Sequence, residues 1–372
     1  MRKTFQYRLF PNPGQTTRLN KTLDGCCWLY NHFLEQRIEI WKNKQEGLSR
    51  YNQDATLKTL KKEHPFLSDI FSQCLQNVSM RIDLAFRAFF RRVKSGSKPG
   101  HPRFRGKFRY NSFTYPQLGF KLLKNVVQLS KTGGIKIKLH RPIEGTIKTC
   151  TVKHAPTGKW FVSFACDIDH NPIEQPAKPT IGIDMGLEFF VTLSNGEQIK
   201  NPRFFRKEEK SLAKVQRKLS TQEKATKTRT EARKIVARVY ERINNKRHNF
   251  CHQESRKLVN RFNTICVEDL SINDMKKDSF RCINKSIGDA AWRMFLSCLS
   301  YKAEYAGQNV IQVNPAFTSQ TCSQCGSRHK LKLSDRMYHC PCCDLSINRD
   351  RNAALNIMTL GLQGLGIPVE AH

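Results

Sequence analysis

The sequence predicts an α/β protein of more than one domain, with a basic N-terminal half rich in strands and a C-terminal half in which strands alternate with helices. The chain has 372 residues, which is room for two or three ordinary domains, and 39% of them are hydrophobic, which is enough to build cores. Segments with strand or helix periodicity follow one another along most of the chain. A stretch with three prolines, 167–179, predicts a linker between the halves.

The N-terminal half begins with a predicted strand and continues with predicted helices. Residues 5–9 alternate polar and apolar side chains, and the sequence PNPG at 11–14 ends that pattern. Helical spacing of apolar residues begins near residue 15 and recurs over roughly 68–93. Further predicted strands cover 119–122, 135–139, 146–148 and 160–166. These strands predict a small β-barrel, and if the first strand belongs to it, the helices form an insertion.

The charge of the chain points to a polyanionic partner. Lys and Arg total 64 against 31 Asp and Glu, for a formal net charge of +33. No acidic residue lies between Asp83 and Glu144, and the densest basic part, 91–109, mixes cations with glycine, proline and aromatic rings. Cations neutralise phosphates and rings stack on unpaired bases, so we expect nucleic-acid contact here, with a solvated loop as the alternative. The expected contacts are Arg91, Arg92, Lys94, Lys98, Arg103, Arg105, Lys107 and Arg109.

A membrane is the less favoured polyanionic surface. No run of residues approaches the roughly 18 apolar residues of a spanning helix, and no basic amphipathic anchor stands apart from the predicted fold. Met1-Arg2-Lys3 leads directly into a strand pattern and not into the apolar core of a signal peptide. We therefore expect a cytoplasmic protein that does not bind membranes.

Four cysteines near the C-terminus have the spacing of a zinc ribbon. They stand in the order C-x₂-C-x₁₄-C-x₂-C. Two such paired thiolates can occupy the corners of a tetrahedron, and a reducing cytosol favours one structural Zn²⁺ over the alternative of disulfides. We expect the neighbouring Cys342 and His339 to stay outside the site, and the cysteines elsewhere to be small buried hydrophobic residues. The predicted ligands are Cys322, Cys325, Cys340 and Cys343.

The elements predicted in the C-terminal half follow the order of an RNase H-like fold: strand, hairpin, helices, strand, helix, strand and, after the ribbon, a last helix. The predicted strands are 180–186, 189–193, 264–270 and 308–313. Charged helices are predicted over 206–219 and 231–262, and an apolar one from 289.

Three carboxylates interrupt elements of this half that should otherwise be buried: Asp184, Glu268 and Asp350. A buried carboxylate needs a cation or a raised pKa. In an RNase H-like fold these three positions meet at one edge of the sheet, where they can hold two Mg²⁺ ions for phosphodiester hydrolysis. Any one of them alone would more often be a helix cap or an ion-pair partner. The three together, in a chain this basic, predict a nuclease.

At these residues the sequence resembles the TnpB family of transposon-encoded RNA-guided nucleases, which are akin to the compact type V CRISPR effectors. The resemblance covers nearly the whole chain and depends on the order of its motifs more than on any one of them. The motifs are YRLFP at 7–11, AFRAFFRR at 85–92, KPGHPRF at 98–104, GIDMG at 182–186, VEDL at 267–270, NPAFTSQ at 314–320 and RDRNAA at 349–354.

The resemblance implies a domain plan. It implies a wedge barrel (1–13 and 106–176) interrupted by a helical recognition lobe (14–105), and a RuvC-like nuclease domain (177–317 and 346–372) interrupted by the zinc ribbon (318–345). It implies a monomeric protein in a ribonucleoprotein, with a guide RNA from the transposon end and double-stranded target DNA as partners. The compartment implied is a prokaryotic cytoplasm, at the nucleoid.

The resemblance also implies roles for residues. Asp184, Glu268 and Asp350 become a metal-binding catalytic triad that uses two Mg²⁺ ions. Residues expected to contact a short motif beside the DNA target are Gln76, Ser112, Phe113, Thr114 and Tyr115. Many relatives have Asp where this chain has Asn348, which leaves an auxiliary role of that position open.

Three alternatives remain beside an active RNA-guided endonuclease. An RNA-guided protein that acts by occupancy would have lost at least one triad carboxylate, and all three are present. A strand-transferring transposase would need to pair two DNA ends, and no oligomerisation element is evident. A guide-independent junction resolvase would not need the large basic N-terminal half.

Overall fold

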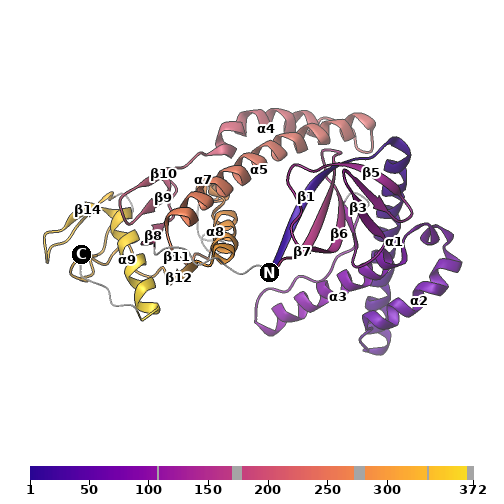
Figure 1. Cartoon of the computed structure of the whole chain (residues 1–372), viewed down its shortest axis with the longest axis horizontal. Helices are drawn as coiled ribbons and strands as arrows, with labels where there is room; N and C mark the ends of the chain where they lie inside the picture. Colours follow the sequence, from indigo (N-terminus) through magenta and orange to yellow (C-terminus); the bar gives the residue numbers. More distant parts are fainter. Residues whose placement is uncertain (107–108, 170–177, 272–280, 333–334, 367–372) are drawn as a thin grey trace. The chain divides into compact units, whose positions relative to one another are not determined.

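The computed structural model describes residues 1–106, 109–169, 178–271, 281–332 and 335–366. They divide into two compact units, Met1–Asp169 and His170–His372, each with its own hydrophobic core (Figure 1). Most of the predicted linker 167–179 lies outside the described residues, and so does the boundary expected after residue 176.

A seven-stranded antiparallel sheet is the framework of the first unit. Its strands are β1 (Arg2–Phe10), β2 (Ser112–Tyr115), β3 (Phe120–Leu123), β4 (Val126–Leu129), β5 (Gly133–Lys138), β6 (Thr146–His154) and β7 (Trp160–Asp167). They lie in the order β2-β6-β7-β1-β5-β4-β3. The first strand is therefore an inner strand, paired with β7 on one side and β5 on the other. Its side chains Phe5, Tyr7 and Leu9 alternate into the core, as the sequence pattern predicts.

The helices of this unit lie between β1 and β2 in the chain. They are α1 (Pro13–Lys44), α2 (Arg50–Glu63), the 3₁₀ helix η1 (Pro65–Asp69) and α3 (Ser72–Lys94). A capping box begins α1: the Asn12 side chain accepts a hydrogen bond from the Gln15 amide at 2.8 Å, and the Gln15 side chain accepts one from the Asn12 amide at 3.0 Å. Pro13 occupies the first turn, where its missing N–H costs nothing.

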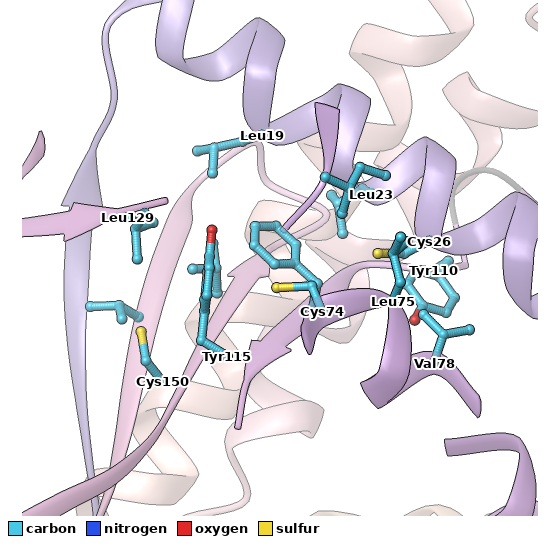
Figure 2. Packing of buried hydrophobic residues seen from close by; sticks show 14 of the residues in the cluster. Leu19, Leu23, Cys26, Cys74, Leu75, Val78, Tyr110, Tyr115, Leu129 and Cys150 are labelled. Atoms are coloured by element: carbon cyan, nitrogen blue, oxygen red, sulfur yellow. The ribbon is translucent and has the colours of Figure 1, made fainter. Parts of the chain in front are cut away.

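One continuous core joins these helices to the sheet. Cys26 of α1, Leu75 and Val78 of α3, and Tyr115 and Cys150 of the sheet are buried in the same cluster (Figure 2). The helical insertion is therefore packed on the sheet as part of one unit and has no separate core of its own.

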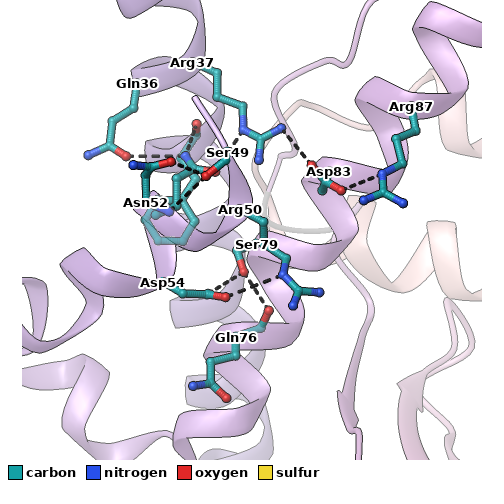
Figure 3. A network of polar contacts seen from close by, with 12 residues as sticks. Gln36, Arg37, Ser49, Arg50, Asn52, Asp54, Gln76, Ser79, Asp83 and Arg87 are labelled. Atoms are coloured by element: carbon teal, nitrogen blue, oxygen red, sulfur yellow. Dashed lines mark hydrogen bonds and ion pairs between the residues drawn. The ribbon is translucent and has the colours of Figure 1, made fainter. Parts of the chain in front are cut away.

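A buried polar network fixes the three long helices to one another (Figure 3). Arg37 of α1 is only 9% exposed; its Nε donates to Gln53 Oε1 of α2 at 2.9 Å, and its Nη1 lies 3.6 Å from Asp83 Oδ1 of α3. Ser79 of α3 donates to Asp54 Oδ1 of α2 at 2.6 Å. Since removing one partner would leave a buried polar group unpaired, this network holds the helices in one register.

The predicted barrel needs a correction, because the paired strands of the described residues leave β2 and β3 as the edges of the sheet. The sheet curls so that side chains join these edges: the rings of Tyr115 and Phe120 lie 6.4 Å apart, and the Tyr115 hydroxyl donates to the Ser130 carbonyl at 3.1 Å. Phe71, at the start of α3, packs against Tyr115 and against Gly119, whose φ of +88° and contact with the Phe71 ring both exclude a side chain. The Phe71 ring thus packs between the two edge strands, β2 and β3, where backbone pairing would be needed to close a barrel.

A five-stranded mixed sheet is the framework of the second unit. Its strands are β8 (Thr180–Asp184), β9 (Phe189–Leu193), β10 (Gln198–Lys200), β11 (Thr264–Glu268) and β12 (Asn309–Val313), and a small hairpin is formed by β13 (Met337–His339) and β14 (Ser346–Asn348). The strand order is β10-β9-β8-β11-β12, in which β8, β11 and β12 are parallel and the first two strands are antiparallel. The succession of elements is the one predicted from the sequence.

The helices of the second unit are α4 (Phe204–Ser220), α5 (Lys227–Arg261), α7 (Arg281–Ala290), α8 (Trp292–Ala306) and α9 (Arg349–Gly364). Helices α4 and α5 pack through a small cluster that includes Leu212, Val239 and Ile243. Phe295 of α8 is buried with Phe190 of β9, with ring centroids 5.0 Å apart. In the described part of the chain, every helix is too short or too polar to cross a membrane.

Helix α9 lies directly against the backbone of β8. A Cβ atom at Gly182 would collide with the Ala354 carbonyl oxygen of α9 and would lie 2.8 Å from the Met358 amide nitrogen. A Cβ at Gly361 of α9 would likewise collide with the Cys266 side chain of β11. The helix and the two central strands therefore approach as closely as they do because both positions are glycine.

We expect Gly182→Ala to lower the free energy of unfolding by about 3 kcal/mol, since overpacking against backbone atoms cannot be relieved by rotating a side chain. Gly364→Ala, in the last turn of the same helix with open space around it, serves as the matched control and is expected to be neutral or stabilising by up to about 1 kcal/mol. Chemical denaturation of the two variants measures the difference. Equal stabilities would contradict the close contact of α9 with β8.

Candidate functional site

The four predicted zinc ligands come together around the small hairpin of the second unit. All their Sγ atoms lie within 4.8 Å of one another. Cys322 and Cys343 are 3.6 Å apart and Cys325 and Cys340 are 3.5 Å apart. Tetrahedral zinc with bonds of about 2.3 Å places its sulfur ligands about 3.8 Å apart, so the four thiols fit this ion.

Local hydrogen bonds shape the loops that carry these thiols. The Cys322 amide donates to the Ser327 carbonyl at 2.8 Å and the Gly326 amide to the Cys322 carbonyl at 3.0 Å, which closes the first turn. The Ser327 hydroxyl lies 3.2 Å from Cys340 Sγ, and this hydrogen bond is the main cause that lowers the pKa of Cys340, whereas burial raises the pKa of Cys322. A thiolate is the form that binds metal, and Cys340 is the thiol closest to that form in this set.

The ribbon is fastened to the first turns of α9. The Ser323 amide donates to Asn352 Oδ1 at 3.0 Å, and Asn352 Nδ2 donates to the Thr321 carbonyl at 2.7 Å. One turn later Asn356 Nδ2 donates to the carbonyls of Thr318 and Thr321. Both asparagines are buried, so these bonds replace the water that their amides would otherwise contact. The ribbon therefore sets the position of the residues that begin α9.

Three elements bring the predicted acids to one edge of the sheet. Asp184 ends β8 and Glu268 ends β11, which are neighbouring parallel strands in register. Asp350 lies in the first turn of α9, the helix that packs on β8. Asn348 caps that helix, since its side chain accepts hydrogen bonds from the amides of Asp350 and Arg351 at 3.0 and 3.2 Å. A helix cap is a role that Asp fills equally well.

The three acids share an environment that disfavours their charges. Burial, followed by the charges of Glu268 and Asp350, raises the pKa of Asp184 to about 8. Burial also raises the pKa of Glu268, although a hydrogen bond from the Thr318 hydroxyl at 2.6 Å acts in the opposite direction. Burial raises the pKa of Asp350, partly offset by Arg336 and Arg349. Because the pKa of Asp184 responds to both other acids, Asp184 lies near each of them.

Carboxylate oxygens are the ligands that Mg²⁺ prefers, so the chemistry of this cluster fits a hard divalent cation. Among the described residues, the sets of three or more ligand atoms that lie within 4.8 Å of one another all belong to the cysteine ribbon. The three carboxylates are therefore spread more widely than the ligands of one small ion.

A cavity of about 760 Å³ lies in the second unit. Arg203, Arg206 and Arg336 line it together with the carboxylates of Glu188 and Asp289, and Arg336 forms an ion pair of 2.7 Å with Glu188. Both members of that pair influence the pKa of Asp350, so one side of the cavity is lined by residues near the third acid. The sequence analysis did not single out these arginines, because nothing in their spacing distinguishes them from the other basic residues of the chain.

The residues predicted to contact a DNA motif lie in different environments. Gln76 is exposed on α3, beside the network that joins α2 and α3 (Figure 3). Phe113 and Tyr115 are each only 1% exposed, because alternate residues of β2 face the core, and this corrects their assignment as contact residues. Ser112 and Thr114 are half-buried on the other face. There Arg81, which the sequence analysis missed, donates to the Ser112 carbonyl at 2.6 Å and to Thr114 Oγ1 at 2.9 Å.

The predicted basic contact region is an exposed surface. Its side chains from Arg91 through Lys98 to Arg109 are solvent-exposed wherever they are described, and Lys107 lies outside the described residues. Phe90 and Phe104 add rings that are 60% and 55% exposed. The loop is anchored at its backbone: the Arg105 amide donates to Asn31 Oδ1 at 2.8 Å, and Asn31 Nδ2 donates to the Arg105 carbonyl at 2.9 Å.

Three family models match the sequence. A helix-turn-helix domain matches residues 1–46, a probable transposase (OrfB_IS605) matches 163–279, and a Cas12f1-like TNB domain matches 292–357. In this structure the described residues of the first match form the strand β1 and the long helix α1. The third match contains the cysteine ribbon and Asp350.

Whole-chain comparisons agree with these matches. The sequence is 35% identical to a putative RNA-guided DNA endonuclease of Streptomyces pristinaespiralis, over 97% of this chain and 90% of the relative. It is 27% identical to the putative RNA-guided DNA endonuclease InsQ of Escherichia coli K12, over 96% of this chain and 92% of the relative. A Cas12f1 chain, solved in complex with single guide RNA and target DNA, has a similar fold, with a TM-score of 0.58 and 16% identity over 93% of this chain and 82% of that chain.

Zinc content tests the ribbon. We expect the purified protein to keep one tightly bound zinc ion through dialysis, and Cys343→Ser to lose it and to melt at a lower temperature, because the ion closes the turns on which α9 rests. The neighbouring Cys342→Ser should keep the tightly bound ion. Elemental analysis and thermal unfolding measure both effects, and full retention of zinc in Cys343→Ser would contradict the four-cysteine site.

The raised pKa of Asp184 predicts that, in the absence of divalent metal, the free energy of unfolding falls as the pH rises. Between about pH 4 and pH 8 the unfolded chain ionises this carboxyl while the folded chain resists ionisation, so the wild type loses stability as the pH rises. Asp184→Asn removes this loss and should be more stable than the wild type at pH 8, with a difference that shrinks toward pH 4. Urea unfolding in a chelator measures it, with the exposed Glu223→Gln as control. A difference that does not vary with pH would contradict the raised pKa.

Proposed function

Since this chain belongs to the TnpB family, we propose that it is an RNA-guided DNA endonuclease, which cuts DNA that pairs with a bound guide RNA. The observation that carries the proposal is the convergence of Asp184, Glu268 and Asp350 from two strands and a helix. The relatives named above, with 90% or more of their length matched, support an activity of the whole protein and not of one domain.

The geometry of the acids supports phosphodiester hydrolysis with a pair of Mg²⁺ ions. Such ions, bound by Asp184, Glu268 and Asp350, would activate a water molecule and stabilise the charge on the leaving 3′ oxygen. Asp184, whose pKa responds to both other acids, would hold the ions together with Glu268 and Asp350, and the metal would supply a Lewis acid for the reaction. Thr318 orients Glu268 through its hydrogen bond, and the cap at Asn348 orients the backbone of Asp350.

Three arginines of the second unit would provide a binding surface for the DNA backbone. Arg203, Arg206 and Arg336 line one cavity, Arg336 influences the pKa of Asp350, and guanidinium groups bind phosphate through paired hydrogen bonds. Their positive charge would hold the strand to be cut against the acids. We assign the second unit, residues 177–317 and 346–372 with the ribbon at 318–345, as the RuvC-like nuclease part.

We assign the first unit to recognition of nucleic acid. The exposed cations and rings of 91–109 are suited to the backbone and unpaired bases of a guide RNA and its heteroduplex with DNA. Gln76, Ser112 and Thr114 remain the proposed contacts with a short motif beside the target, and Arg81 holds the last two in place. The curled sheet takes the place of the wedge barrel in this assignment, and the helices that of the recognition lobe.

The decisive test separates cutting from binding. The protein is purified from cells, its bound RNA is sequenced, and a DNA duplex matching the 3′ segment of that RNA is offered with Mg²⁺. We expect Asp184→Asn to cut at least about 1,000-fold more slowly, because loss of a metal ligand removes several kcal/mol of transition-state stabilisation and about 1.4 kcal/mol is worth a factor of ten.

The same variant should bind the duplex as tightly as the wild type, and Glu223→Gln, which removes an exposed charge from the same unit, should cut normally. Undiminished cutting by Asp184→Asn would overturn the assignment of the acids. If no discrete RNA copurifies, guidance by RNA is refuted.

Salt dependence of binding tests the basic surface. Each cation that contacts a phosphate contributes about 0.7 to 0.9 to the slope of log affinity against log salt, so Lys98→Ala with Arg103→Ala should lower the slope by up to about 2. Lys58→Ala with Lys62→Ala removes two exposed charges from α2 and serves as the charge-matched control. An equal change of slope in both double variants would mean that binding follows net charge and not this surface.

A further inference from the structure

The ribbon contains more metal-ligating side chains than a four-cysteine site uses. His329, Cys340 and Cys342 offer ligand atoms that all lie within 4.8 Å of one another. His329 Nε2 and Cys342 Sγ are 3.8 Å apart. This second set shares Cys340 with the four-cysteine site. The two sets together contain six different side chains, and the Cys340 thiol belongs to both sets.

We propose that the ribbon binds a second thiophilic divalent cation of the zinc class, held by His329 and Cys342 and by the Cys340 thiolate, which bridges it to the first ion. A tetrahedral ion with bonds of about 2.3 Å to sulfur and about 2.0 Å to nitrogen separates those atoms by about 3.5 Å, so a shift of a few tenths of an ångström completes the fit. Three protein ligands leave one position for water, and Cys342 is exposed, so the ion has access from solvent.

The local backbone explains why Cys342 and His329 meet on the outer side of the ribbon. The Asp344 amide donates to the Cys340 carbonyl at 3.0 Å, and this turn directs Cys340 and Cys343 to the four-cysteine site and leaves Cys342 outside. The His329 amide donates to the Gln320 carbonyl at 3.0 Å beside the bridge between Thr321 and Arg328. Residues 13 positions apart are thereby brought to the same side of Cys340.

The Ser327 hydroxyl lies near side chains of both sets. It lies 3.0 Å from Cys325 Sγ, 3.2 Å from Cys340 Sγ and 3.0 Å from His329 Nε2. The second ion must displace this hydroxyl from His329, which makes its site weaker than the closed four-cysteine site. The electrostatics favour it nonetheless, since four thiolates around one divalent ion carry an excess negative charge that a second cation offsets.

The test counts cations on the full-length chain and uses ¹¹³Cd²⁺ as the probe, in excess Mg²⁺ so that the carboxylate cluster is occupied. Native mass spectrometry should find two Cd²⁺ per chain in the wild type and in His339→Asn, which removes an exposed histidine of the same hairpin that belongs to neither set. Cys342→Ser and His329→Asn should each lose one of the two ions. Thermal unfolding checks that every variant remains folded.

The bridge itself has a spectroscopic signature. In the wild type, ¹¹³Cd NMR should give two resonances with mutual scalar coupling through the shared Cys340 sulfur, and the resonance that remains in Cys342→Ser should be uncoupled. One ion per chain in the wild type would overturn the proposal. So would a second ion that persists in Cys342→Ser and His329→Asn, or two resonances without coupling. None of these readouts depends on DNA cleavage.

Discussion

The direct contact of helix α9 with the backbone of β8 and with Cys266 of β11 is the constraint on which the candidate site depends. Gly182 and Gly361 allow this contact, since a side chain at either position would collide with the opposing element. The helix carries Asp350 in its first turn, whereas the two strands end at Asp184 and Glu268. A helix held at a larger distance would take the third carboxylate away from the other two. The glycines at 182 and 361 therefore help to determine how near Asp350 lies to Asp184 and Glu268.

Burial of the three acids opposes folding. Burial raises the pKa of all three carboxyls, and in Asp184 the neighbouring acids add to the effect. Burying like charges together opposes folding unless protons or cations neutralise them. The surroundings offset part of this cost with Thr318, Arg336 and Arg349. The buried asparagines of α9 that hold the ribbon then keep the third acid in place, so the cysteine ribbon supports the position of Asp350.

The first unit holds many positive charges on an exposed surface. Its helices share one core with the curled sheet, and Asn31 of α1 fixes the backbone of Arg105 while the side chains of the basic loop stay exposed. A loop that is ordered before binding loses less conformational entropy when a partner binds. Packing of the helices against the sheet therefore buries the core and also positions the basic loop, through the contact of Asn31 with the backbone of Arg105.

The sequence by itself predicted the order of most elements and the grouping of the four cysteines, because periodicity and ligand spacing are local properties. It also singled out three acids, whose shared role stays a prediction. It missed β2 and β4, since four-residue strands have too short a pattern, and it assigned Phe113 and Tyr115 to a surface although they face the core. Only the tertiary structure decided that an inserted Phe71 seals the edges of the sheet and that His329 approaches Cys342. The face of a strand that becomes buried, and the side chains that pack against it, depend on residues far away in the chain, so a local sequence pattern does not reveal them.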